Sequence, residues 1–200
     1  MKSLSDWPRP LMDTGVGLHV QTQASNQVYG VDSPEAREHP DTWRQMGVRW
    51  LKLLTDGDSQ LKAAERFVKL GFMVVVRFHA EKPHPGFVPA VDLMKRFTDV
   101  GVRYAEGGNE ADHPVEYTHR PSIKELGEQY LLFADAAAHA GIIPCFYAFE
   151  GDRLIDWVLP IFRYIIEKRK RRDALEGSAL AGHWRPGNYW RRQPDASEKT

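Results

Sequence analysis

Hydrophobic and polar positions follow one recurring pattern along this chain: an amphipathic stretch, then a glycine, then a short apolar run with polar residues at its far end. Four glycines precede such runs, at 48–54, 72–79, 102–106 and 142–150: Gly47, Gly71, Gly101 and Gly141. A glycine just past a helix supplies the left-handed residue of a C-cap. Continuous apolar runs are typical of parallel strands that are covered on both faces. With an earlier strand at 16–22 and a weaker one at 178–183, the pattern predicts six strands.

The stretches between these runs have the periodicity of helices. Apolar residues recur at helical spacing after Asp58 and again over 91–100. Ser122 and Glu125 have the spacing of a capping box, which predicts the start of a long helix. A further helix is expected from about residue 154, with Pro160 bending or dividing it. Alternating strands and helices predict an α/β fold with a parallel sheet.

Composition places the chain in a broad class. It has 200 residues, 42% of them hydrophobic and 27% charged, which suits one globular domain over 1–200. We expect residues 1–14 and 191–200 to be poorly ordered. The N-terminus has no apolar segment of signal-peptide length, so the chain as written is expected to be cytoplasmic, or secreted if a leader was removed. The apolar span 131–149 contains polar residues and predicts a helix and a strand, so no membrane partner is expected.

Charge and cysteine content exclude further classes. Lys plus Arg and Asp plus Glu each number 27, so no overall field attracts nucleic acid or acidic lipid. The basic run 168–172 is interpreted as a solvated helix end, because no aromatic or glycine residues interleave with it. The single Cys145 excludes an intramolecular disulfide and a multi-cysteine metal site. We expect it to be a small core residue.

Polar residues gather at the far ends of the predicted strands, where the sites of parallel α/β folds form. The candidate ligand-binding residues at these ends are His19, Lys52, Arg77, His79, Glu106, Tyr147 and His183. Alternation places Arg77 and His79 on the same side of their strand as two apolar residues, which is typical of a barrel interior. A lysine within a leucine-rich strand requires a carboxylate partner, so Lys52 indicates a nearby acid. Together these ends predict a cleft, although His79 alone would be read as a structural histidine.

Several kinds of site are not indicated. The chain has no Walker-type phosphate loop, no G-x-S-x-G elbow, and no dinucleotide fingerprint following a strand. His79, Glu81, His84 and His113 could in principle hold a metal ion, but their spacing matches no standard site. We therefore predict no metal and no cofactor.

The segment Glu106-Gly107-Gly108-Asn109-Glu110 follows the fourth predicted strand, and it resembles the E-x-x-N-E pattern of the clan A glycoside hydrolases. The resemblance implies a (β/α) barrel of the TIM type, with Glu110 as general acid/base and Asn109 bound to the sugar 2-hydroxyl. It also implies that Arg77, His79 and Tyr147 line the sugar cleft. A full barrel takes about 250 residues, so a partial barrel of about six β/α units is expected.

The chain departs from this family pattern in two ways. Ala111 stands where proline commonly follows the acid/base, and no seventh strand is available to carry the nucleophilic glutamate. Glu150 is the candidate on a neighbouring strand end. A retaining enzyme needs the second carboxylate roughly 5 Å from the first, and an inverting enzyme needs it about 6.5–9.5 Å away.

Two functional hypotheses follow, both with a carbohydrate partner. The first is a glycoside hydrolase-like protein, with Glu110 as general acid/base and Glu150 as the candidate second carboxylate. The second is a non-catalytic carbohydrate-binding or scaffold protein on a degenerate or truncated barrel. A barrel enzyme for phosphorylated metabolites is disfavoured, because no late glycine-rich phosphate loop is present. A six-stranded barrel also leaves two open edges, which predicts association into homo-oligomers.

Overall fold

The computed structural model describes residues 7–20, 40–79, 88–108, 110, 119–147, 149 and 154–180. Within them the chain forms one parallel sheet whose six strands lie side by side in chain order. The strands are β1 (Gly17–Val20), β2 (Trp50–Thr55), β3 (Met73–Phe78), β4 (Tyr104–Glu106), β5 (Ile143–Phe146) and β6 (Ala179–Leu180). Each strand pairs in parallel with the next, and in this part of the chain β6 does not pair with β1. The predicted parallel α/β fold is confirmed as a six-stranded sheet that is not closed.

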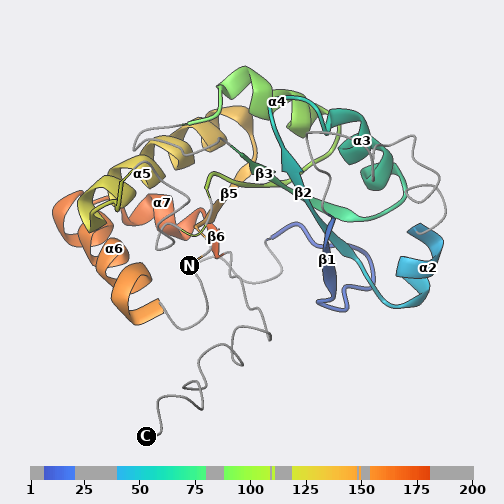
Figure 1. Ribbon diagram of the computed structural model, residues 1–200, viewed down its shortest axis with the longest axis horizontal. Helices are drawn as coiled ribbons and strands as arrows, with labels where there is room; N and C mark the ends of the chain where they lie inside the picture. The colour runs from blue at the N-terminus through green and yellow to red at the C-terminus, as the bar shows by residue number, and fades with distance from the viewer. Residues whose placement is uncertain are drawn as a thin grey trace, which may run out of the picture.

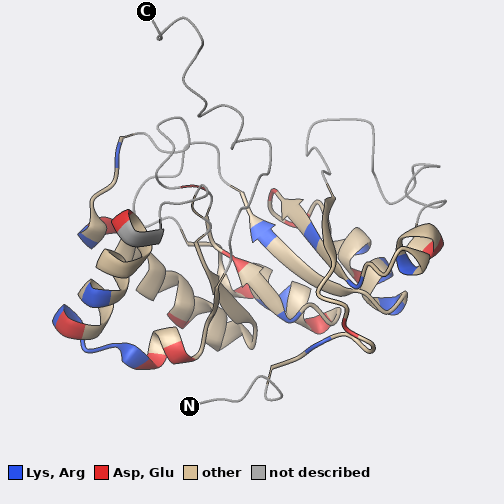
Figure 2. Ribbon diagram, turned by 90° about the horizontal axis from the view of Figure 1, so that it is seen from below, with Lys and Arg blue, Asp and Glu red and all other residues tan. Residues whose placement is uncertain are grey.

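Helices follow the strands along the chain and form an arc around one side of the curved sheet (Figure 1). They are α2 (Pro40–Gln45), α3 (Leu61–Lys69), α4 (Val91–Asp99), α5 (Ile123–Ala140), α6 (Leu159–Arg163) and α7 (Arg172–Glu176). Lys, Arg, Asp and Glu are interspersed along these helices (Figure 2). No described helix is both long and apolar enough to cross a membrane.

The signals that predicted α5 are present at both of its ends. The Ser122 side chain accepts a hydrogen bond from the Glu125 backbone N–H, and the Glu125 carboxylate accepts one from the Ser122 N–H at 2.7 Å. This capping box satisfies two of the backbone donors that a helix start leaves unpaired. At the other end Gly141 adopts the left-handed conformation, with φ 72°, so the predicted glycine C-cap is confirmed there.

Strand alternation separates the two faces of the sheet. The side chains that face the helices are fully buried, such as Leu51 and Leu53 on β2 and Val74 and Val76 on β3. Their neighbours on the opposite, inner face are partly buried, and they include Lys52. The apolar core therefore lies between the sheet and the helices, and the inner face carries polar side chains such as Lys52 together with apolar ones such as Val75.

The segment that was predicted to bend or divide at Pro160 runs as one helical stretch with changing pitch. Two π-helical turns, Leu154–Val158 and Tyr164–Lys168, flank α6, and Pro160 lies in the first turn of α6. The basic run that follows is largely exposed, as expected of a solvated helix end. Within it Arg171 forms ion pairs with Asp135 on α5 and with Asp173.

Candidate functional site

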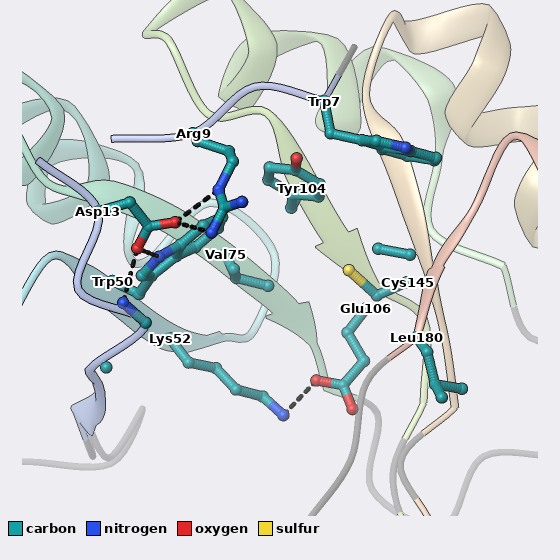
Figure 3. Close-up of a pocket in the computed structure, with 13 residues that line it drawn as sticks. Trp7, Arg9, Asp13, Trp50, Lys52, Val75, Tyr104, Glu106, Cys145 and Leu180 are labelled. Carbon is teal, nitrogen blue, oxygen red and sulfur yellow. Dashed lines mark hydrogen bonds and ion pairs between the residues drawn. The ribbon is translucent and has the colours of Figure 1, made fainter. Parts of the chain in front are cut away.

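A buried ion pair lies at the centre of the inner face. Lys52 on β2 reaches across β3 to the carboxylate of Glu106, the last residue of β4 (Figure 3). The Glu106 side chain is fully buried, and only 18% of the Lys52 side chain is exposed. The carboxylate that a lysine in this strand requires is thus Glu106. Mutual neutralisation allows both charges to remain largely out of water.

Other predicted polar residues also lie at the carboxyl ends of the strands. Arg77 is paired in register with Glu106 and is 7% exposed. Tyr147 follows β5 and is fully buried, and Glu110 is 3% exposed. His79 is half-buried just past β3, and its backbone N–H donates to the Thr55 carbonyl.

The remaining predicted site residues lie on an edge strand or outside the described residues. His19 lies on the edge strand β1, in register with Lys52, and is exposed. Asn109, Glu150 and His183 lie outside the described residues. The structure therefore brings Lys52 and Glu106 into direct contact. The roles of all these residues in binding or catalysis stay predictions.

Gly107 allows the chain to pass close to α5 directly after β4. A Cβ atom at Gly107 would lie 2.6 Å from ring carbons of Phe133, a fully buried residue of α5. Real Cβ atoms essentially never come this close to another heavy atom. The backbone after β4 can therefore pass over this ring only because position 107 has no side chain.

A pocket of about 590 Å³ lies against the inner face, on the amino-terminal side of the ion pair (Figure 3). It is lined by Trp7, Arg9, Asp13, Gly15, Gly17, Trp50, Lys52, Val75, Tyr104, Glu106, Cys145, Ala179 and Leu180. Lys52 and Glu106 are the predicted site residues among them. A volume of this size is in the range of small-molecule sites.

Sequence reasoning missed the segment that closes one end of this pocket, residues 7–15, called here the N-terminal strap. Its Asp13 carboxylate accepts hydrogen bonds from the Trp50 indole N–H and the Gly15 backbone N–H, both at 2.8 Å. The Tyr104 hydroxyl donates to the Pro8 carbonyl at 2.7 Å. The strap thus makes specific contacts with β2 and β4, and the expectation that residues 1–14 are poorly ordered stays a prediction.

One signal for the pocket was present in the sequence. Trp50 and Tyr104 stand two residues before Lys52 and Glu106 on their strands, so period-two alternation places all four side chains on one face. The two aromatic ring centroids lie 5.6 Å apart, with the planes tilted by 57°. An aromatic wall on the amino-terminal side of the ion pair could have been inferred from this spacing.

Ionisation within the pocket follows from its hydrogen bonds and burial. The pKa of Asp13 is lowered, first by the Gly15 backbone N–H, then by the Trp50 indole N–H and by Arg9. Burial, with a smaller contribution from the nearby Glu106, raises the pKa of Cys145 to about 12. The thiol therefore stays protonated near neutral pH. No cluster of three or more His, Cys, Asp or Glu side chains suited to a metal ion occurs in the part of the chain that the structure describes.

Comparisons with known proteins return fold-level similarities. No protein-family model matches the chain, and no curated protein matches it. Among solved structures, Saccharomyces cerevisiae Gas2p in complex with laminaripentaose is similar over 86% of this chain and 48% of that one, with 13% identity and a TM-score of 0.45. ScGas2 in complex with compound 9 is similar over 83% of this chain and 47% of that one, with 14% identity and a TM-score of 0.44.

A third similar structure is the 4-hydroxy-2-oxoglutarate aldolase/2-deydro-3-deoxyphosphogluconate aldolase from TTHB1. It covers 84% of this chain and 82% of that one, with 12% identity and a TM-score of 0.31. The chain spans about half the length of the Gas2 chains. At these identities and TM-scores the similarities assign neither a family nor an activity to the chain.

Proposed function

We propose that this chain carries a glycoside hydrolase-like carbohydrate site at the carboxyl ends of its strands, with Glu110 as general acid/base. The observation that supports the proposal is the buried Lys52–Glu106 ion pair, with Glu110 also buried four residues farther along the chain. Buried charged or titratable side chains grouped at this end of a parallel sheet are typical of a functional site.

In this proposal Glu106 has a supporting role, which its ion pair with Lys52 supports. An uncompensated charge on a neighbouring Glu106 would help to keep Glu110 protonated by repulsion. Because Lys52 compensates that charge, the repulsion is reduced. In the proposal Lys52 and Glu106 therefore form a rigid polar wall that binds sugar hydroxyls, and Glu110 supplies the proton for the leaving oxygen.

The other predicted residues retain proposed roles around this wall. Arg77 and Tyr147 would donate hydrogen bonds to sugar hydroxyls, because guanidinium and phenol groups are donors of suitable reach. His19 and His79 would contribute at the rim. The remaining assignments come from the motif and the strand order: Asn109 on the 2-hydroxyl, Glu150 as second carboxylate and His183 as a sugar contact.

A second candidate function is a carbohydrate-binding protein without turnover. Hydrolysis needs a second carboxylate on the opposite side of the glycosidic bond from the acid. Glu106 shares the inner face with the proposed site, but its carboxylate is held by Lys52. This observation favours binding without hydrolysis unless Glu150 acts as the partner.

The test compares wild type with Glu110→Gln on an activated aryl glycoside and on laminaripentaose. If the chain is a hydrolase, the amide cannot donate a proton and the rate falls by about 10²–10⁴-fold, least for the better leaving group. If it only binds, wild type shows no turnover and Glu110→Gln binds sugar with an affinity within a few-fold of wild type. Glu176→Gln, the same change at an exposed position of α7, is the matched control. Absence of both turnover and sugar binding in wild type rejects the proposal.

A further inference from the structure

The pocket on the amino-terminal side of the ion pair differs from the proposed carbohydrate site in most of its lining residues. Glu110, Arg77, His79 and Tyr147 are not among its lining residues. It is instead lined largely by aromatic and aliphatic side chains of the inner face and by the N-terminal strap, and it reaches the edge strands β1 and β6 through Gly17, Ala179 and Leu180. Lys52 and Glu106 belong to both, but the rest of the lining is not shared, so the pocket could accept a ligand of different chemistry.

Trp50 and Tyr104 present ring surface to this pocket, and their polar atoms bond to the strap. The Trp50 indole N–H donates to Asp13, and the Tyr104 hydroxyl donates to the Pro8 carbonyl. Val75, Cys145 and Leu180 add further apolar surface. The walls are thus suited to the flat apolar faces of a ring compound.

Charged groups occur as two pairs at opposite ends of the pocket (Figure 3). Arg9 is paired with Asp13 on the strap, and Lys52 is paired with Glu106. Each pair is neutral overall, so the pocket offers no net charge to balance an ion. Trp50 contacts Asp13 at one end, and Lys52 forms the pair at the other end. These two residues are two positions apart on β2, so the two ends are separated by about 7 Å along the strand direction.

We propose that this pocket binds an uncharged aromatic compound with hydroxyl groups at opposite ends of its ring system. A carboxylate accepts several hydrogen bonds and an ammonium donates three, so one hydroxyl can join the Lys52–Glu106 pair. A guanidinium is a donor of five hydrogen bonds, so Arg9 can serve the other end. A sugar would be suited less well, because its hydroxyls surround the whole ring and several would meet apolar walls without partners.

Isothermal titration calorimetry with 2,6-dihydroxynaphthalene tests the ligand chemistry. We expect saturable one-to-one binding by the wild-type chain. Replacing both hydroxyls by methoxy groups removes the donors and should weaken binding at least about tenfold. Naphthalene-2,6-disulfonate should also bind more weakly, because its charges lose water without gaining a counter-charge. Equal affinity for all three compounds would overturn the proposal, and so would tighter binding of methyl glucoside.

Variants test the location. Ala179→Phe on β6 should fill the pocket and abolish binding, whereas Ala138→Phe on the exposed face of α5 should leave affinity unchanged. If Ala179→Phe does not fold by circular dichroism, Val75→Phe fills the same pocket from β3. Binding that survives in a folded pocket-filling variant rejects the location. Glu176→Gln, on α7 and outside the pocket lining, should keep wild-type affinity for the naphthalene compound. The titration is done without sugar, so this proposal can fail or succeed separately from the carbohydrate site.

Discussion

Lys52 and Glu106 belong to strands that are not neighbours, and their ion pair spans the whole width of β3 on the inner face. The pair therefore ties β2 to β4 by side chains alone, without a backbone hydrogen bond between the two strands. Figure 3 shows the lysine extended toward the carboxylate.

Removing one partner of this pair should be strongly destabilising. We expect Lys52→Met to lower the free energy of unfolding by about 3–5 kcal/mol, because it leaves the Glu106 carboxylate buried without its cation. The double change Lys52→Met with Glu106→Leu should recover most of the loss. Urea unfolding followed by circular dichroism measures both. A single variant as stable as wild type would show that the pair contributes little.

Gly107 should tolerate no side chain. Gly107→Ala brings a methyl group against the Phe133 ring, and we expect a loss of about 1–3 kcal/mol, as for other overpacked cores. Gly177→Ala is the control, since Gly177 has φ −86° and its nearest neighbour would be 3.4 Å away. Chemical denaturation compares the two. Adding Phe133→Leu should relieve part of the Gly107→Ala effect, and no relief would contradict the contact.

The strap should loosen in acid. The pKa of Asp13 is lowered in the folded chain, so the unfolded chain binds more protons at low pH. Its stabilising effect is then fully present above the ordinary aspartate pKa of about 3.9 and is lost as the pH falls below it. The free energy of unfolding should decline less steeply with acid in Asp13→Asn than in wild type. Identical slopes would contradict the assignment.

Cys145 should react slowly in the folded chain. With its pKa raised to about 12, roughly 10⁻⁴ of the thiol is ionised at pH 8, and only the thiolate reacts. Alkylation by iodoacetamide, followed by mass spectrometry, should therefore be at least about a hundredfold slower than in urea-unfolded protein. Equal rates in the two states would indicate an accessible thiolate.

The open sheet edges should promote self-association. In the described residues β1 pairs with β2 alone and β6 with β5 alone, and Leu18 and Leu180 on these strands are exposed. Sedimentation velocity should show concentration-dependent dimers. Leu180→Lys should reduce them, and Leu132→Lys, on the exposed face of α5, should not. A monomer at all concentrations would reject this prediction.

The sequence predicted the fold because its signals are local. Each apolar run after a glycine became a strand, and the Ser122–Glu125 spacing became a capping box. It also showed that Lys52 needs a carboxylate, since burial of an amine in a strand is costly whatever the fold. Period-two alternation, which placed Arg77 among the inner-face residues, is also a local property of a strand.

The partner of Lys52 and the strap could not be predicted in this way. Choosing Glu106 among several acids requires the order of strands in space. The strap has no periodic pattern, and its hydrogen bonds join residues far apart in the chain: Asp13 and Trp50 are separated by 37 positions, and Pro8 and Tyr104 by 96. Contacts between such distant positions produce no local sequence pattern from which they could be predicted.

Those separations also affect the order in which the chain folds. Residues 7–15 are synthesised before β2 and β4, but their partners on the sheet, Trp50 and Tyr104, are in place only after both strands have been made and paired. A loop that closes over so many residues costs more entropy than the short connections between neighbouring β/α units. The strap should therefore dock late in folding and be among the first segments to open in the native state, and its opening would remove one end of the pocket.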